Sequence, residues 1–141
     1  MTLRARPLAC PAVPEPPGAT FSNALRVGDE LIISGMTAHP AASQATMDTA
    51  AQARECLRKI EALVRAAGGS LDNVLKLVVY LTDISHKDAV NTVRREVFSA
   101  PYPASTLVGV AALVFPALTV EIDATIRLDA VRAPALDTDK P

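Results

Sequence analysis

The chain has 141 residues, half of them apolar and only 4% aromatic, which suits one domain with a core of Val, Leu, Ile and Ala. Its 15 acidic and 14 basic residues leave a formal net charge of −1, so no surplus of cations is available for nucleic-acid phosphates. No apolar run reaches the roughly 18 to 20 residues of a membrane helix, and no apolar stretch of signal-peptide length begins the chain. We therefore expect a cytoplasmic protein with no membrane partner, and nucleic acid is disfavoured as a partner.

The two cysteines and two histidines indicate neither a disulfide framework nor a metal centre. Cys10 lies in a Pro-rich head and Cys56 in a predicted helix, so their spacing matches no known ligand pattern. The sequence also lacks a glycine-rich loop of the kind that cradles phosphates. We predict that the protein holds no metal and needs no cofactor.

Proline content divides the chain into three parts. Residues 1–18 carry prolines at positions 7, 11, 14, 16 and 17, too many for a helix or a central strand. They predict an extended Pro-rich arm. Residues 19–130 form the expected domain, and residues 131–141 are predicted to be a flexible C-terminal tail.

The first half of the domain predicts a hairpin and a helix. Residues 21–27 and the apolar run 31–33 are typical of strands, and Gly28-Asp29 between them is a hairpin signal. From 48 to 67 the apolar residues recur every three or four positions, which is the spacing of one helix face. Gly68-Gly69 is expected to end that helix.

The second half predicts three strands and another helix. Residues 74–81 are almost uninterruptedly apolar, as in a strand that is buried on both faces. A helix begins near Ser85 and ends before Pro101. Residues 105–113 and 119–128 are the last strands, and the second alternates apolar and polar residues.

The resulting order, ββαβαββ, predicts an α+β fold in which two helices cover one face of a single-layer mixed sheet. Residues 74–81 and 107–113 are apolar on both alternations, so the uncovered face would leave a large apolar surface on a monomer. Layer counting therefore predicts self-association.

Two segments carry a resemblance to a known family. Residues 103–108 read PASTLV, and residues 120–124 read VEIDA. The chain resembles the reactive-intermediate deaminase family, also called Rid or YjgF and known as endoribonuclease L-PSP, whose pattern reads Pro-Ala-Arg-Ser-Thr-Val and later Val-Glu-Ile-Glu-Ala. Weaker matches in the same order extend the resemblance from residue 21 to residue 128.

The resemblance implies a chorismate-mutase-like fold that assembles as a homotrimer, with small-molecule ligands in clefts between subunits. It implies that Glu121 is the catalytic residue and positions water near the imine carbon of the substrate. The residues that match ligand-binding positions are Phe21, Ser22, Gly35, Asn91, Ser105 and Thr106.

The chain departs from this family at its ligand anchor, because Ser105 stands where the family has an arginine. A hydroxyl supplies a hydrogen bond but no charge. The resemblance therefore implies a ligand that is less charged than the usual small 2-imino acid. Arg26, Arg94 and Arg95 remain as sources of a cation, and the pattern places none of them beside Ser105, so a substitute stays open.

Three functions follow from the resemblance, and the sequence leaves open whether the protein is an enzyme. The first is hydrolysis of a reactive enamine or imine, with Glu121 activating water. The second is a trimer that binds a metabolite without turning it over, which the missing arginine favours. The third, an endoribonuclease or translation inhibitor, ranks last because the chain offers no cationic surface for RNA.

Overall fold

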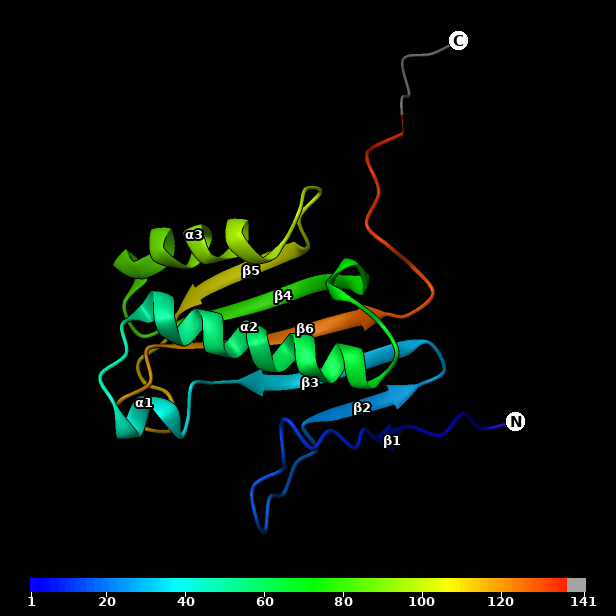
Figure 1. Ribbon diagram of the computed structural model, residues 1–141, viewed down its shortest axis with the longest axis horizontal. Coiled ribbons are helices and arrows are strands. Elements are labelled where there is room, and N and C mark those ends of the chain that lie inside the picture. Colours follow the sequence, from blue (N-terminus) through cyan, green and yellow to red (C-terminus); the bar gives the residue numbers. More distant parts are fainter. Residues whose placement is uncertain (137–141) are drawn as a thin grey trace.

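The computed structural model describes residues 1–136, which form one mixed sheet with helices on one face (Figure 1). In that part of the chain the sheet has six strands in the order β1-β2-β3-β6-β4-β5, and only β4 and β5 run parallel. The strands are β1 (Arg6–Pro7), β2 (Ala24–Val27), β3 (Glu30–Met36), β4 (Val74–Leu81), β5 (Ala104–Gly109) and β6 (Val120–Arg127). The helices are α1 (Ala41–Gln44), α2 (Thr49–Ala66) and α3 (Lys87–Val97), with short 3-10 turns η1 (Leu71–Asn73) and η2 (Ile84–His86). The α+β fold with a single mixed sheet is confirmed.

Helix α2 begins and ends where the sequence signals lie. The Asp48 carboxylate accepts a hydrogen bond from the backbone N–H of Ala51 at 2.8 Å and so caps the first turn. Beyond the last turn Gly68 has a φ of +87°, a left-handed conformation that favours glycine. Across residues 1–136, no helix combines the length and apolar character that a membrane crossing requires.

The two faces of the sheet differ as the alternation in β6 predicts. Val120, Ile122, Ala124 and Ile126 are buried beneath the helices, and the polar side chains between them are only partly buried on the opposite face. No helix of residues 1–136 covers that opposite face, which we call the open face (Figure 1). It also exposes apolar side chains, including Ile32 on β3 and Val108 on β5.

The Pro-rich arm pairs with the sheet and packs against the core, which its sequence does not predict. Arg6 and Pro7 pair with β2 as the short edge strand β1, a position that tolerates proline because one side of the strand needs no partner. Val13 is 7% exposed and packs in the core. The arm thus adds a strand to the sheet of its own chain.

Two strand boundaries and one predicted loop differ clearly from the prediction. Strand β2 begins at Ala24 rather than at residue 21, and the predicted loop after β3 contains the short helix α1. Strand β5 ends at Gly109 rather than at residue 113, because its pairing partner β4 ends at Leu81. These differences leave the predicted order of the main elements unchanged.

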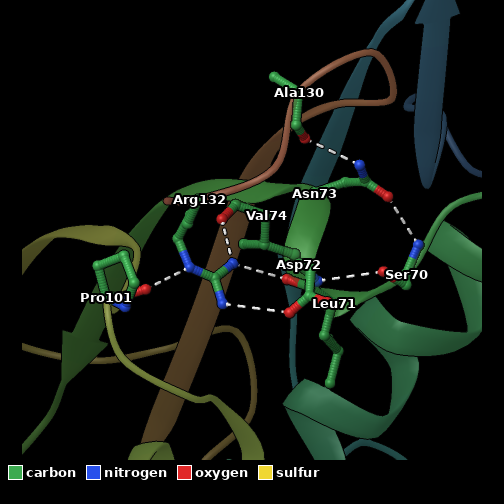
Figure 2. Close-up of polar contacts among 8 residues, drawn as sticks. All are labelled: Ser70, Leu71, Asp72, Asn73, Val74, Pro101, Ala130 and Arg132. Atoms are coloured by element: carbon green, nitrogen blue, oxygen red, sulfur yellow. Dashed lines mark hydrogen bonds and ion pairs between the residues drawn. The ribbon is translucent and has the colours of Figure 1, made fainter. Parts of the chain in front are cut away.

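The beginning of the predicted tail is held by Arg132 (Figure 2). Its side chain is 8% exposed, and it donates to the carbonyl oxygens of Pro101 at 2.6 Å and of Leu71 and Val74 at 2.7 Å each. The guanidinium also lies 5.4 Å from the ring centroid of Phe98. Residues up to Arg132 are therefore fastened to the domain, and residues 137–141 of the predicted tail lie outside the described residues.

Candidate functional site

Glu121 lies on the open face of the sheet, in the central strand β6. Its side chain is half-buried and lies directly against Gly35 of β3. A Cβ atom on residue 35 would come within 2.6 Å of Glu121 Oε2 and 2.9 Å of its Cγ, so only glycine leaves room for this arrangement. The register of β3 against β6 shifts between Ile33 and Met36, which places Gly35 at an irregularity in the ladder.

Within residues 1–136 the Glu121 carboxyl group has neither a hydrogen-bond partner nor a counter-charge in contact with it. The neighbouring Asp123, by contrast, accepts a hydrogen bond of 3.1 Å from the Tyr80 hydroxyl. Burial raises the pKa of the Glu121 carboxyl, and the charge of Asp123 adds to the rise. A carboxyl group with a raised pKa and free oxygen atoms is suited to hold water and to exchange protons with it.

Phe21 and Ser22 come to the same part of the open sheet. The hydroxyl of Ser34 donates to the backbone carbonyl of Ser22 at 2.6 Å, and the Ser34 backbone N–H donates to Asn23 at 2.9 Å. The segment before β2 therefore runs beside the β3 segment that carries Gly35, and Phe21 is 53% exposed there. We call Phe21, Ser22, Gly35 and Glu121 the glutamate half-site.

Ser105 lies at the start of β5 and contacts an arginine. Arg94 Nη1 donates a hydrogen bond of 2.6 Å to Ser105 Oγ. Arg94 belongs to the last turn of α3, the helix that lies along β5 (Figure 1), and Asn91 precedes it by three residues, on the same side of the helix. We call Asn91, Arg94 and Ser105 the arginine half-site. Arg94 is therefore the arginine that lies beside Ser105, which the sequence alone left open.

The sequence contained one signal for Arg94. Val90 and Val93 are the buried residues of α3, and Arg94 follows them by four positions and one position. A residue with that spacing borders the apolar stripe of a helix, where a long side chain can lie over the neighbouring strand. Helical phase alone does not say which residue of that strand it meets, because this depends on how the helix packs.

Within one chain the two half-sites are separated. Ser105 pairs with Leu77, which pairs with Ala124, so Ser105 lies two strands across and three residues along from Glu121. Standard strand dimensions make this separation about 14 Å. The alternation of β5 also puts Ser105 on the helix side of the sheet and Thr106 on the open face. A small ligand therefore cannot touch Glu121 and Ser105 of the same chain.

Two hollows of the described chain lie elsewhere. One of about 480 Å³ is lined by residues 42–47 and Ala117, and another of about 380 Å³ is lined by the arm between Pro7 and Glu15. Both are open to solvent, and neither borders Glu121 or Ser105. None of the predicted site residues lines either of these two hollows.

Comparison with known proteins agrees with the fold. Residues 13–128 match the family described as Endoribonuclease L-PSP. RutC family protein y4sK of Sinorhizobium fredii is 40% identical over 79% of this chain and 91% of its own length. The 2-iminobutanoate/2-iminopropanoate deaminase of Dermatophagoides farinae is 29% identical over 77% of this chain and 85% of its own. The crystal structure of PA3499 from Pseudomonas aeruginosa, a protein of unknown function, has a TM-score of 0.90 and 49% identity, and the alignment covers 95% of this chain and 99% of that one.

Proposed function

The chain belongs to the endoribonuclease L-PSP family, which is also called the Rid or YjgF family, and on that premise we propose that it hydrolyses a reactive enamine or imine. The carbon of an imine is already electrophilic, so a catalyst has chiefly to orient the substrate, hold water and move protons. The similarity to a mite protein named as a 2-iminobutanoate/2-iminopropanoate deaminase supports this reaction class.

Glu121 carries the chemistry in this proposal. Its carboxylate accepts a proton from water as the water oxygen bonds to the imine carbon, and it passes that proton to the nitrogen, which gives a carbinolamine. It then takes the proton of the new hydroxyl group and delivers it to the nitrogen as the carbonyl forms, the C–N bond breaks and ammonia leaves. The observation that carries the proposal is the environment of this side chain, half-buried against Gly35 and without a partner in residues 1–136. A structural glutamate in a sheet would normally be paired or fully solvated.

The proposal includes assembly as a homotrimer whose ligand clefts lie between subunits. The separation of the two half-sites supports a shared cleft, because the glutamate half-site of one chain needs the arginine half-site of another to enclose a small molecule. A head-to-tail contact of this kind closes into a ring when its rotation permits. The apolar side chains on the open face, such as Ile32 and Val108, favour contact with another copy.

Release of ammonia from freshly generated imines tests the reaction. Glu121→Gln keeps the shape of the side chain and removes the proton acceptor, so we expect the rate to fall by about 10²-fold or more. Glu30→Gln is the matched control, since Glu30 lies on the same face near the opposite end of β3 from Gly35, and it should retain wild-type activity. Equal activity in wild type and Glu121→Gln, or no release above the spontaneous rate from any imine tested, would contradict the proposal.

A second function is favoured by Ser105, which replaces the anchoring arginine of the family pattern. In this case the trimer binds a metabolite and leaves it unchanged. Ligands would then raise the melting temperature of the protein and be recovered intact after long incubation. Cleavage of RNA ranks third, as the balanced charge of the chain offers little to a polyanion.

A further inference from the structure

Arg94 has an unusual environment for an arginine. In residues 1–136 only Arg94 and Arg132 are not largely exposed, and Arg132 is surrounded by backbone carbonyl oxygens. Exposed arginines such as Arg54 and Arg127 form close ion pairs with carboxylates. Arg94 contacts no carboxylate in the described part of the chain, and its single hydrogen bond goes to the Ser105 hydroxyl.

Most of the donors on Arg94 are unused. A guanidinium carries five N–H donors, and one of them is taken by Ser105. The Nε atom of Arg94 is buried and has no hydrogen-bond partner. Burial lowers the pKa of this group, and no neighbouring charge offsets the effect. A buried donor and a half-buried charge that lack partners are costly to keep, which points to a partner outside the described residues.

We propose that Arg94 and Ser105 form an anion site that binds the carboxylate of the ligand, with Arg94 as the anchoring cation. The proposal deepens the proposed function and rests on it, because it gives the ligand in the same cleft a negative charge. It places the cation on helix α3, whereas the family pattern has it on the strand. The expectation of a less charged ligand depended on there being no cation beside Ser105, and Arg94 provides one.

The geometry suits a carboxylate. The Ser105 hydroxyl is exposed and accepts from Arg94, so its own proton is free to donate to an anion at the same place. Asn91, one helical turn earlier, makes no side-chain hydrogen bond within residues 1–136 and offers an amide donor nearby. A single planar guanidinium with a hydroxyl matches a carboxylate monoanion, while phosphates are usually held by several cations or by backbone amides.

The alternative is that the Arg94–Ser105 contact only ties α3 to β5. Glutamine at position 94 would lose the charge and keep an amide for that contact. If the contact is only structural, Arg94→Gln would change the stability of the protein but would not change its preference between a charged and a neutral ligand. In our proposal it removes discrimination between a carboxylate and a neutral analogue of the same shape.

Calorimetric titration of the 141-residue chain with 2-oxobutanoate and with the neutral 2-oxobutanamide tests the proposed anion site. Wild type should bind the carboxylate at least about tenfold more tightly than the amide, as expected for a charge-assisted hydrogen bond. Arg94→Gln should lose that preference, and Ser105→Ala should lose part of it. Arg95→Gln is the matched control, since the Arg95 side chain is exposed and makes no hydrogen bond to Ser105 within residues 1–136, and it should bind like wild type.

The outcomes separate this inference from the deaminase proposal. Carboxylate binding that depends on Arg94, without turnover of any imine, would support the anion site and contradict the deaminase. Imine turnover that is equal in wild type and Arg94→Gln would support the deaminase and overturn the anion site. Equal binding of the carboxylate and the amide by wild type, or no binding of either, would also overturn the anion site. Melting temperatures of each variant confirm that the proteins compared are folded.

Discussion

Arg132 and Arg94 are the two arginines that the described chain partly or wholly buries, and their surroundings are opposite. Arg132 donates to three carbonyl oxygens and has Asp72 nearby (Figure 2). Its guanidinium also lies over the ring of Phe98. Arg94 has one hydroxyl as its partner and a buried Nε without any. The difference in hydrogen-bond partners distinguishes an arginine that stabilises the fold from one whose donors remain for the proposed ligand.

The contacts of Arg132 also help to position the arginine half-site. Its guanidinium joins the loop before β5, through Pro101, to the start of β4, through Val74. Ser105 follows Pro101 by four residues, so the position of the arginine half-site depends on an anchor that is satisfied within the chain. Stability and binding are thereby assigned to different arginines of the same region.

The largest effect on stability is expected from Arg132→Ala. The change removes the donor of three hydrogen bonds, two to the partly buried carbonyl oxygens of Leu71 and Val74 and one to the exposed carbonyl oxygen of Pro101. We expect a loss of about 3 kcal/mol or more in the free energy of unfolding, measured by chemical denaturation. Arg127→Ala is the control, because its ion pair with Asp129 is exposed and should contribute less than about 1 kcal/mol. A loss as small as that of the control would remove the contrast between the two arginines.

Gly35→Ala tests whether close approach to Glu121 matters. The added methyl group would overlap the Glu121 carboxylate, and the side chain would have to move. We expect activity to fall by about tenfold, since misplacement of a catalytic group by an ångström is costly, while the unfolding free energy changes little on this partly exposed face. The φ of Gly35 is not positive, so alanine fits the backbone there, and an effect of the substitution would come from the contact with Glu121. Unchanged activity would mean that Glu121 does not need its present position.

The pH dependence of stability tests the burial of Glu121. Its pKa is raised in the folded protein, so ionisation of this carboxyl opposes folding. Above the raised pKa, Glu121→Gln should therefore be more stable than wild type. This advantage should shrink as the pH falls through the raised pKa and should disappear below the ordinary pKa of a glutamate. Paired urea titrations at several pH values measure it, and an advantage that grows on acidification would contradict the assigned burial.

The smallest effect on stability is expected from Arg94→Gln. The substitution removes a half-buried charge that has no counter-charge within residues 1–136, so the loss of one hydrogen bond is offset by easier burial. We expect the unfolding free energy to stay within about 0.5 kcal/mol of wild type. A loss comparable to that of Arg132→Ala would identify Arg94 as a structural residue.

The sequence predicts those parts of the molecule that depend on local patterns. The alternation in β6 places Glu121 on the face opposite the helices, and Asp48 and Gly68 mark the ends of α2. Strand β1 was not predicted, because its prolines argue against a strand and only its edge position makes one acceptable. The family resemblance, rather than the pattern, singled out Gly35 and Glu121.

Contacts between distant segments were beyond prediction. The meeting of Arg94 with Ser105 depends on the packing of α3 over β5, which helical phase does not determine. The acceptors of Arg132 are backbone carbonyl oxygens, which are present at every residue and leave no signal in the sequence. For the same reason the division of the site residues into two half-sites emerges only from the strand register.

Subunit complementation tests the central claim, that one chain's Glu121 works with another chain's Arg94. Glu121→Gln and Arg94→Gln subunits, each of which we expect to lose most of its activity alone, are unfolded together in equal amounts, refolded and assayed for ammonia release. In a three-membered ring about three quarters of the trimers are mixed, and each mixed trimer regains one of its three sites, so we predict about a quarter of wild-type activity. A mixture no more active than the separate variants would contradict the shared cleft.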